Sequence, residues 1–362
     1  MAQEPISGSR LEDLELFYEE AKRYQSRPLW VARTDPQPKA IPYLWKYQDF
    51  RPLLFRAAEI VPMEMAERRV LVFSNPGLLG RGPATSTLSA NLQIINPGEV
   101  APSHRHTASA LRLIVEGASA YTAVEGEKTY MEPGDFITTP NWTWHDHGNE
   151  GDAPMIWLDG LDSTLVNHLD ATFREEYPEE SQPLTKPTEV SQRLFASGSL
   201  RPTWVGRGSL HSPLINYKFA QTYEALSRLA QETEGSPFDG VCLEYTNPQT
   251  GGPAMASMAC YASLFPKGMH TRAHRHTGGV VYHVITGSGY SVINGVRFDW
   301  SAKDTFVVPS WAFHEHVATE ESVVFWYTDT PVLEPLGLYR EEAFELNEGH
   351  QPVTANFAPI AV

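Results

Sequence analysis

Most of the chain consists of short apolar or alternating runs separated by clusters of Gly, Pro, Asn and Asp. Clear examples are residues 113–116, 136–139, 280–285 and 305–308, and such runs are typical of antiparallel strands. Residues 10–25, rich in Leu and Glu, and residues 222–233 are instead patterned as helices. The pattern therefore predicts an all-β protein with an N-terminal helical arm and one helix between two groups of strands.

The chain also repeats itself. The segment HRHTASALRLIVEG returns as HRHTGGVVYHVITG, and PNWTWHDHG returns as PSWAFHEHV. Four positions keep one constant offset and two keep an offset one residue shorter: Gly98/Gly268, His104/His274, His106/His276 and Gly117/Gly287, then His145/His314 and His147/His316. Self-similarity on this scale indicates two copies of one structural unit.

A length of 362 residues is comfortable for two domains that each bury a core. Residues 175–187 combine Pro, Ser, Glu and Gln, which is typical of a linker. We therefore expect an N-terminal helical arm (1–60), a first and catalytic domain (61–174), a linker with an inter-domain helix (175–235), and a second domain (236–362).

The composition narrows the class of protein. The net charge of −16 argues against a nucleic-acid or anionic-membrane surface. Cys242 and Cys260 alone cannot form a disulfide framework, and no secretory signal or membrane-spanning stretch is visible, so we expect a cytoplasmic protein. With 13 histidines and two cysteines, a bound metal would be held by imidazole rather than by thiolate.

His104 and His106 are the first candidates for such ligands. Alternate residues of a strand share one face, so both imidazoles can reach one ion while Arg105 points away. For a single His-x-His pair, two half-exposed histidines would be the simpler interpretation. The repeat changes this, because each pair is followed by another histidine, His145 or His314, at nearly the same spacing.

These residues resemble the two motifs of the cupin superfamily. The first motif aligns from Gly98 to Gly117 and the second from Gly134 through Pro140 and His145 to Asn149, with Trp142 in a glycine position. The second half aligns likewise, with Lys303 and Ala318 replacing the outer Gly and Asn. The resemblance implies a bicupin fold of two jelly-roll β-barrels.

The position that many cupins give to a fourth, glutamate ligand holds Ala110 in one half and Val280 in the other. Three neutral imidazoles leave a divalent ion its full charge and open positions for substrate or dioxygen. Arg112 shares the inward face of Ala110 and suits a substrate carboxylate, although pairing with a structural Asp or Glu is the alternative. The equivalent residue in the second half is Tyr282, so we expect the chemistry in the first domain, and His274, His276 and His314 as a second metal site.

His147 lies two residues beyond His145, on the same face but further along the strand. It suits a hydrogen bond to substrate or a proton transfer better than metal ligation. Because His316 repeats it, closure of the barrel mouth is an equally good explanation.

Longer segments narrow the resemblance to the gentisate 1,2-dioxygenase family, which includes salicylate and 1-hydroxy-2-naphthoate dioxygenases. They are ERRVLVFSNPGL (67–78), GEVAPSHRH (98–106), ALRLIVEG (110–117), TPNWTWHDHGN (139–149) and WLDGLD (157–162). The resemblance implies an extradiol-type ring-cleaving dioxygenase that opens gentisate to maleylpyruvate with dioxygen. It also implies one Fe(II) per subunit in the first domain, no flavin, haem or nicotinamide, and a homotetramer.

By position the resemblance makes His104, His106 and His145 iron ligands, Arg68 and Arg112 carboxylate contacts, and His147 a substrate-side residue. Gln93 and Asp159 become supporting groups. Asp159 could orient a ligand imidazole or cap a turn, and Gln93 could belong to a structural network. Arg68 has no local motif and rests on the resemblance alone.

Ser89 and Asn91 depart from the family, which commonly has an aromatic residue and a glycine there. If this strand lines the pocket, the site is larger and gains an amide for a polar ring substituent. Salicylate, 5-substituted salicylates including 5-nitrosalicylate, and 1-hydroxy-2-naphthoate are therefore alternative substrates; innocuous packing of both residues is the other interpretation.

Two competing classes remain. A non-catalytic cupin that binds or stores aromatic acids would be expected to have lost ligands, whereas this chain keeps both histidine sets. An isomerase or decarboxylase bicupin is disfavoured by Ala110 and Val280 in the glutamate positions.

Overall fold

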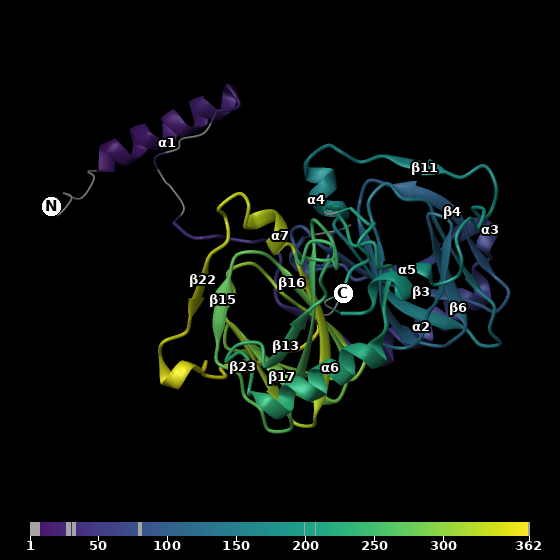
Figure 1. Ribbon diagram of the computed structural model, residues 1–362. Helices are drawn as coiled ribbons and strands as arrows, with labels where there is room; N and C mark the ends of the chain where they lie inside the picture. Colours follow the sequence, from purple (N-terminus) through teal and green to yellow (C-terminus); the bar gives the residue numbers. More distant parts are fainter. Residues whose placement is uncertain are drawn as a thin grey trace. The chain divides into compact units, whose positions relative to one another are not determined.

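The structure is a computed structural model that describes residues 8–26, 30, 34–78, 82–198, 200–206 and 208–360. It separates into two units, residues 1–37 and 38–362. The smaller unit contains helix α1 (Gly8–Arg23), close to the predicted 10–25, and Phe17 of this helix stacks on Trp30 at 5.8 Å between ring centroids (Figure 1). No helix of the described residues is long and apolar enough to cross a membrane.

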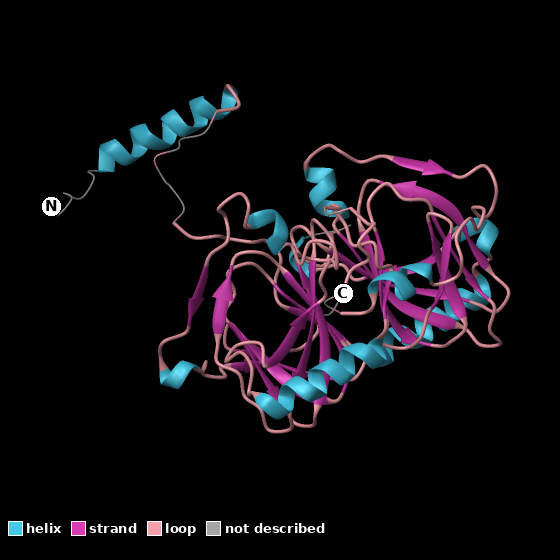
Figure 2. Ribbon diagram, viewed as in Figure 1, coloured by secondary structure: helices cyan, strands magenta, loops and turns pink. Residues whose placement is uncertain are grey.

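The larger unit is built mainly from strands (Figure 2). In its first half they are β1 (Tyr43–Trp45), β2 (Arg69–Val72), β3 (Ser89–Ile95), β4 (Val100–His106), β5 (Ala110–Glu116), β6 (Ala120–Val124), β7 (Glu127–Tyr130), β8 (Phe136–Thr139), β9 (His145–Asn149), β10 (Met155–Leu161), β11 (Arg174–Glu176) and β12 (Asn216–Tyr217). In its second half they are β13 (Val241–Glu244), β14 (Ala259–Phe265), β15 (His274–His276), β16 (Val280–Thr286), β17 (Ser288–Ile293), β18 (Val296–Ser301), β19 (Thr305–Val308), β20 (His314–Ala318), β21 (Ser322–Thr328), β22 (Glu341–Ala343) and β23 (Ala355–Asn356).

The helical segments of this unit are short. They are α2 (Tyr47–Ile60), α3 (Met63–Ala66), α4 (Ser163–His168), α5 (Val190–Phe195), α6 (Phe219–Glu232) and α7 (Thr330–Leu333), with 3-10 turns η1 (Pro76–Leu78) and η2 (Asn347–Gly349). The helix predicted at 222–233 is α6. The sequence pattern did not predict α2, which contains Pro52 and buries Leu54.

Each half forms a barrel of two facing sheets, as the bicupin prediction required. The first barrel joins the sheet β12-β8-β5-β10-β3-β2 to the sheet β11-β4-β9-β6-β7. The second joins β1-β19-β16-β21-β14-β13 to β22-β15-β20-β17-β18-β23. All of these strand pairs are antiparallel except β18 with β23.

Strand β3 shows how the sequence divides between two cores. Ala90, Leu92 and Ile94 point out of the first barrel into a large apolar core shared with the second barrel. Ile95 points into the first barrel's own interior. Because both faces are covered, the strand is almost continuously buried, which leaves little surface for a simple alternation of polar and apolar residues.

The two barrels exchange edge strands. Strand β1 pairs with β19 of the second barrel, whereas α2, which follows β1 directly, packs on β2 and β3 of the first. Strand β12 pairs with β8 of the first barrel, whereas α6, which follows it, packs on β13 and β14 of the second. The boundaries expected at residues 60, 174 and 235 remain a prediction. The sheet that contains β1 combines strands from both sides of residue 60, and the sheet that contains β12 combines strands from both sides of residue 174.

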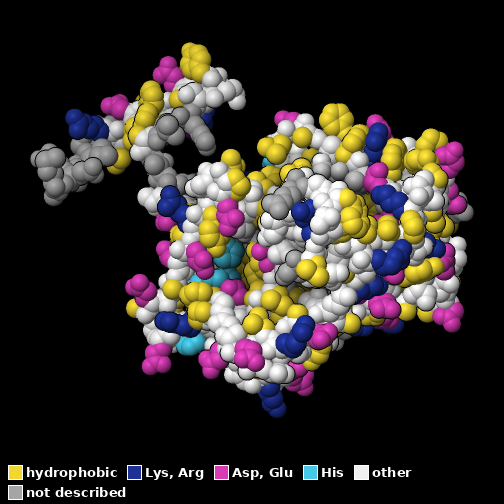
Figure 3. All heavy atoms as spheres, viewed as in Figure 1, with side chains coloured by type: hydrophobic (Ala, Val, Ile, Leu, Met, Phe, Trp, Pro, Cys, Tyr) yellow, Lys and Arg dark blue, Asp and Glu magenta, His cyan; other side chains and the backbone are white. Residues whose placement is uncertain are grey.

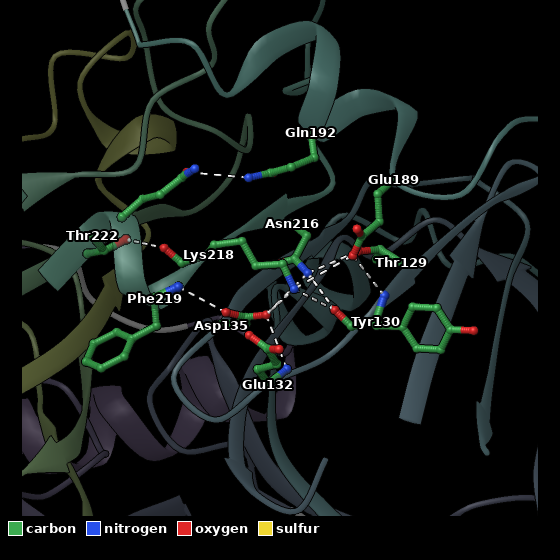
Figure 4. A network of polar contacts seen from close by, with 11 residues as sticks. Thr129, Tyr130, Glu132, Asp135, Glu189, Gln192, Asn216, Lys218, Phe219 and Thr222 are labelled. Atoms are coloured by element: carbon green, nitrogen blue, oxygen red, sulfur yellow. Dashed lines mark hydrogen bonds and ion pairs between the residues drawn. The ribbon is translucent and has the colours of Figure 1, made fainter. Parts of the chain in front are cut away.

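Matching ion pairs hold both exchanged segments. Asp135 of the first barrel accepts hydrogen bonds from Lys218 Nζ at 2.8 Å and from the Phe219 backbone N–H at 3.0 Å, where α6 begins (Figure 4). Asp304, at the equivalent position of the second barrel, accepts them from Lys46 Nζ at 2.8 Å and the Tyr47 N–H at 2.9 Å, where α2 begins. A helix N-terminus favours a carboxylate, so each aspartate anchors a segment that packs on the opposite barrel.

Candidate active site

The structure brings His104, His106 and His145 together inside the first barrel. His104 and His106 lie on β4, and His145 on β9 lies directly opposite His104 in the strand register. Their ring centroids are 4.2 to 5.2 Å apart, and one ring nitrogen from each lies within 4.8 Å of the others. Arg105 points to the outer face, where its guanidinium lies 4.5 Å from the ring centroids of Trp142 and of Trp144.

The turn between β8 and β9 has a left-handed backbone conformation and is bonded to the strand of His106. Trp142, which occupies a glycine position of the cupin motif, has a φ of 60°. Its backbone N–H donates to the His106 carbonyl at 2.7 Å, and Trp311 repeats this in the second barrel with a φ of 66° and a bond to His276. Both positions therefore keep the left-handed backbone conformation that favours glycine, although the residue is tryptophan. In each barrel the tryptophan ring contacts an arginine, Arg105 or Arg275.

The hydrogen bonds of two imidazoles suit metal ligation. His106 Nδ1 donates to the Ala108 carbonyl at 2.7 Å and His145 Nδ1 to the Thr143 carbonyl at 2.9 Å, which leaves Nε2 of both rings free for a cation. His145 Nε2 is buried without a hydrogen-bond partner. Burial lowers the pKa of His106 to about 4 and that of His145 well below its ordinary value, so both rings are neutral. These residues fit a divalent metal ion.

Arg68 lies against His104. Its Nη2 is 2.7 Å from His104 Nδ1 and 2.7 Å from the Pro102 carbonyl. An N–H donated to Nδ1 favours the ring proton on Nε2, the opposite tautomer to that of His106 and His145, whereas the Pro102 carbonyl, 3.3 Å from the same Nδ1, favours the tautomer that leaves Nε2 free. Ligation of a metal through His104 Nε2 therefore requires this Arg68 contact to open.

Arg112 lies deep in the same barrel. Its Nε is 3.2 Å from Asp159 Oδ1, and it also donates to Thr139 Oγ1. Asp159 in turn accepts a hydrogen bond from Trp157 Nε1 at 3.1 Å. Arg112 is thus paired with an aspartate, which was the alternative to a free carboxylate-binding arginine. Asp159 contacts Arg112 and Trp157 rather than a ligand imidazole.

Burial dominates the electrostatics of these groups. It lowers the pKa of Arg68 to about 10, with a further contribution from the Arg112 charge, and it raises the pKa of Asp159 against the opposing effect of Arg112. Asp159 is the buried carboxylate that acts on both Arg68 and Arg112, and Glu67, which also acts on Arg68, is already paired with Arg174. The site therefore carries an excess of positive charge that suits an anionic ligand.

Ser89, Asn91 and Gln93 follow one another along the inward face of β3. They lie opposite Leu161, Asp159 and Trp157 of β10, so Asn91 continues the row that contains Asp159 and Arg112. Asn91 Oδ1 is buried without a partner. Ser89 Oγ instead bonds to the Leu161 carbonyl at 3.2 Å and to Ser163 Oγ at 3.1 Å, and Gln93 is 2% exposed.

His147 stays outside the three-histidine cluster. Its ring centroid is 5.8 Å from that of His145, and its Nδ1 lies 2.6 Å from Thr122 Oγ1. The Nε2 atom is buried without a partner, and burial lowers the pKa of the ring well below its ordinary value. His316 of the second barrel bonds similarly to Ser291 Oγ at 2.8 Å.

One polar strand near the site was not anticipated. Strand β11 pairs with β4, so that Arg174 lies opposite His106 and Glu176 opposite His104. Arg174 forms ion pairs with Glu67 and Glu176, both at 2.8 Å. The sequence placed the start of a linker here, because a short, polar, exposed strand carries no periodic signal; only its pairing partner reveals it.

The second barrel holds a similar cluster. His274, His276 and His314 are buried, and their ring centroids are 4.4 to 5.6 Å apart. His274 Nδ1 bonds to Glu341 Oε1 of β22 at 2.8 Å, Phe238 stacks on its ring, and Tyr282 occupies the position of Arg112. Figure 3 shows histidine atoms in a hollow bordered by acidic side chains on this part of the surface. This cluster also fits a divalent ion, but it has no buried arginine.

Fold and site together define a bicupin with two three-histidine clusters, of which one lies beside two arginines, the buried Arg112 and the half-buried Arg68. A family model described as cupin domain matches residues 91–160 and 262–328. Gentisate 1,2 dioxygenase 1 from Aquipseudomonas alcaligenes is 41% identical over 330 residues, which cover 90% of this chain and 95% of that protein. 5-aminosalicylate 1,2-dioxygenase from a Comamonas species is 38% identical over 357 residues, covering 95% and 94%.

Among solved structures, salicylate 1,2-dioxygenase from Pseudoaminobacter salicylatoxidans, in adducts with gentisate, superposes with a TM-score of 0.86. It is 32% identical, over 94% of this chain and 96% of that one. The chain belongs to the gentisate 1,2-dioxygenase family of bicupin ring-cleaving dioxygenases. The family and the fold expected from the sequence are thereby confirmed.

Proposed function

We propose that this protein is an Fe(II)-dependent dioxygenase that opens gentisate between the carboxylate-bearing carbon and its hydroxylated neighbour. Both atoms of dioxygen enter the product, maleylpyruvate, and cleavage is of the extradiol type. The observation that carries the proposal is the pairing of three neutral imidazoles with the buried Arg112 and the half-buried Arg68, where Ala110 replaces a fourth, acidic ligand. Relatives named for gentisate and for substituted salicylates support it.

His104, His106 and His145 would bind the iron, one ion per subunit in the first barrel. Imidazole accepts several transition metals, so iron is taken from the family. When bound, a ferrous ion supplies the electronic link between dioxygen and an electron-rich ring.

The chain's own residues bind and orient the substrate. Arg68 and Arg112 neutralise the carboxylate. Asp159 forms an ion pair beside Arg112 Nε at 3.2 Å, which leaves the outer nitrogens of the guanidinium for Thr139 and for the substrate. His147, neutral at physiological pH, presents Nε2 to a substrate oxygen. Gln93 is buried opposite Trp157 in the strand register, on the same strand as Asn91, and its role is to support that strand.

A related substrate, 5-aminosalicylate, is the second candidate, because Asn91 suits its ring amine as well as the 5-hydroxyl of gentisate. The unpartnered Oδ1 of Asn91 is an acceptor that suits a hydroxyl or amino substituent on the ring. Besides the ortho-hydroxyl that all these acids share, gentisate and 5-aminosalicylate carry a second donor at ring position 5, whereas salicylate, 5-nitrosalicylate and 1-hydroxy-2-naphthoate have none. Ser89 completes the same wall of the pocket.

The decisive experiment is anaerobic reconstitution with ferrous iron, followed by gentisate and dioxygen while the ring-fission chromophore is monitored. We expect His104→Ala to abolish turnover and His274→Ala to retain it, because the second barrel lacks the arginine. Loss of activity in His274→Ala alone would reverse the assignment of the two barrels. Absence of turnover with every ortho-hydroxy acid tested would favour a binding protein.

The remaining parts of the proposal rest on resemblance and composition. A homotetramer predicts four chains per particle by light scattering. A cytoplasmic location predicts that both cysteines stay reduced in the cell. The cluster of His274, His276 and His314 is proposed to hold a metal without cleaving rings.

A further inference from the structure

A third group of potential metal ligands lies on the outer face of the second barrel. Glu315 follows His314 on β20 and therefore points to the opposite side of the sheet from the buried cluster. His270 forms an antiparallel bridge with Val317, which lies on β20 as Glu315 does. His350 follows the 3-10 turn η2. One donor atom from each residue lies within 4.8 Å of the other two.

The three donor atoms already converge. His350 Nδ1 is 2.9 Å and His270 Nε2 is 3.4 Å from the same oxygen, Glu315 Oε2. Zinc bonds of about 2.0–2.1 Å in tetrahedral geometry place ligand atoms about 3.4 Å apart. The distance from His270 to Glu315 already has this length, and the distance from His350 to Glu315 would have to lengthen slightly. The two imidazole rings are in contact, with centroids 3.9 Å apart and planes tilted by 33°.

The carboxylate is held ready for this role. Glu315 is 1% exposed, and its other oxygen, Oε1, accepts the Gln351 backbone N–H at 2.9 Å. That bond fixes the orientation of the carboxylate and leaves Oε2 for the imidazoles or for a cation. His270, 40% exposed in its side chain, gives an ion a path from solvent.

The first barrel provides an internal comparison. Asp146 occupies the position of Glu315 and accepts hydrogen bonds from Gln182, which corresponds to Gln351. Gln182 bonds to the Ala123 carbonyl just as Gln351 bonds to the Val292 carbonyl. The positions of His270 and His350 hold Val100 and Ser181 there. The same framework thus forms without either imidazole, so the fold does not require the pair of histidines.

We propose that His270, Glu315 and His350 form a zinc site on the outer face of the second barrel, with water as the fourth ligand. Two imidazoles, one carboxylate and an open position are a common zinc ligand set. The ion would join β20 to the segment between β22 and β23, and so clamp the C-terminal part of the chain to the barrel. The site is separate from both buried three-histidine clusters.

The test compares the whole chain with the variant His270→Val/His350→Ser, which copies Val100 and Ser181 of the first barrel. Zinc bound per chain is measured by equilibrium dialysis and elemental analysis. We expect the variant to bind one equivalent less, while His274→Ala lowers the count independently. Equal zinc content in wild type and variant would overturn the proposal, since the buried clusters would then account for all the metal.

Two further measurements locate the ion and guard against misfolding. Anomalous diffraction at the zinc edge is expected to give a peak beside His270, Glu315 and His350, and a map with peaks only at the buried clusters refutes the site. Zinc is also expected to slow amide hydrogen exchange in residues 347–356 of the wild type and not of the variant. If the double variant folds poorly, the single His270→Val change, at a partly exposed position, serves instead with the same expected loss.

Discussion

Arg112 and Asp159 lie directly opposite each other on β5 and β10, with Arg112 Nε 3.2 Å from Asp159 Oδ1. Both side chains are buried, so each is the other's main counter-charge in a low-dielectric interior. The pair leaves the outer nitrogens of the guanidinium for Thr139 and for a ligand. One arginine is thereby both part of the barrel's structure and a candidate binding group.

Asp159→Asn is expected to destabilise the fold, because it leaves the Arg112 charge without compensation. Removing one partner of a buried ion pair costs about 3–5 kcal/mol, and the isosteric amide places this change at about 3 kcal/mol. Urea unfolding measures the change in free energy. A loss below about 1 kcal/mol would show that the pair contributes little.

Arg112→Lys tests binding separately from structure. Lysine keeps the positive charge beside Asp159 but lacks the planar fork, so we expect KM for the aromatic acid to rise about tenfold or more with a smaller effect on stability. Arg105→Lys, on the outer face of the neighbouring strand β4, is the control and should leave KM unchanged. An unchanged KM in Arg112→Lys would make the arginine purely structural.

Arg68→Met is expected to act in opposite directions on metal and substrate. The Arg68 contact with His104 Nδ1 opposes the tautomer that ligates through Nε2, so its removal should tighten metal binding to the substrate-free protein about tenfold. The same change removes a carboxylate contact and should raise KM. Metal titration of the substrate-free chain and steady-state kinetics measure the two effects, and weaker metal binding would contradict the first.

Asn91→Ala tests the recognition of the ring substituent. If Asn91 Oδ1 accepts a hydrogen bond from a ring hydroxyl or amine, the ratio of kcat/KM for gentisate to that for salicylate should fall about tenfold. Ser89→Ala is the matched control on the same strand face, because its hydroxyl already bonds to Leu161 and Ser163. Equal ratios in wild type and Asn91→Ala would leave substituent choice to other residues.

Glu116 makes a pH-dependent contribution to the contact between the barrels. A hydrogen bond from Arg51, with others from Tyr47 and Lys303, lowers the pKa of this carboxyl from 4.5 to about 2. A lowered pKa in the folded state stabilises the fold above pH 4.5, and the contribution disappears as the pH falls toward 2. Since the carboxylate is partly exposed, it is worth about 1 kcal/mol.

Glu116→Gln should therefore be less stable than the wild type at pH 7 and should approach it at pH 3. The free energy of unfolding in urea at both pH values measures the difference. Glu224→Gln, on the exposed face of α6, is the control. A gap between wild type and Glu116→Gln that stays the same at both pH values would rule out the linkage.

The sequence by itself determined the strands, the repeat and the grouping of His104 with His106, because these follow from local periodicity. Alternate residues of one strand share a face wherever that strand lies, and Arg105 accordingly points outward onto Trp142. The repeat then indicated that the His-x-His pair and the later histidine form the same kind of cluster in both halves of the chain. Family resemblance added Arg68, for which no local signal exists.

Only the tertiary structure decided which distant residues meet. Four features depend on strand register. They are the pairing of Arg112 with Asp159, the position of β11 beside His104, the exchange of β1 and β12 between the barrels, and the convergence of His270 and His350 on Glu315. Register is set by packing between segments far apart in the chain, and a shift of one residue turns every side chain to the other face. The local periodicity of the sequence therefore does not predict the strand register.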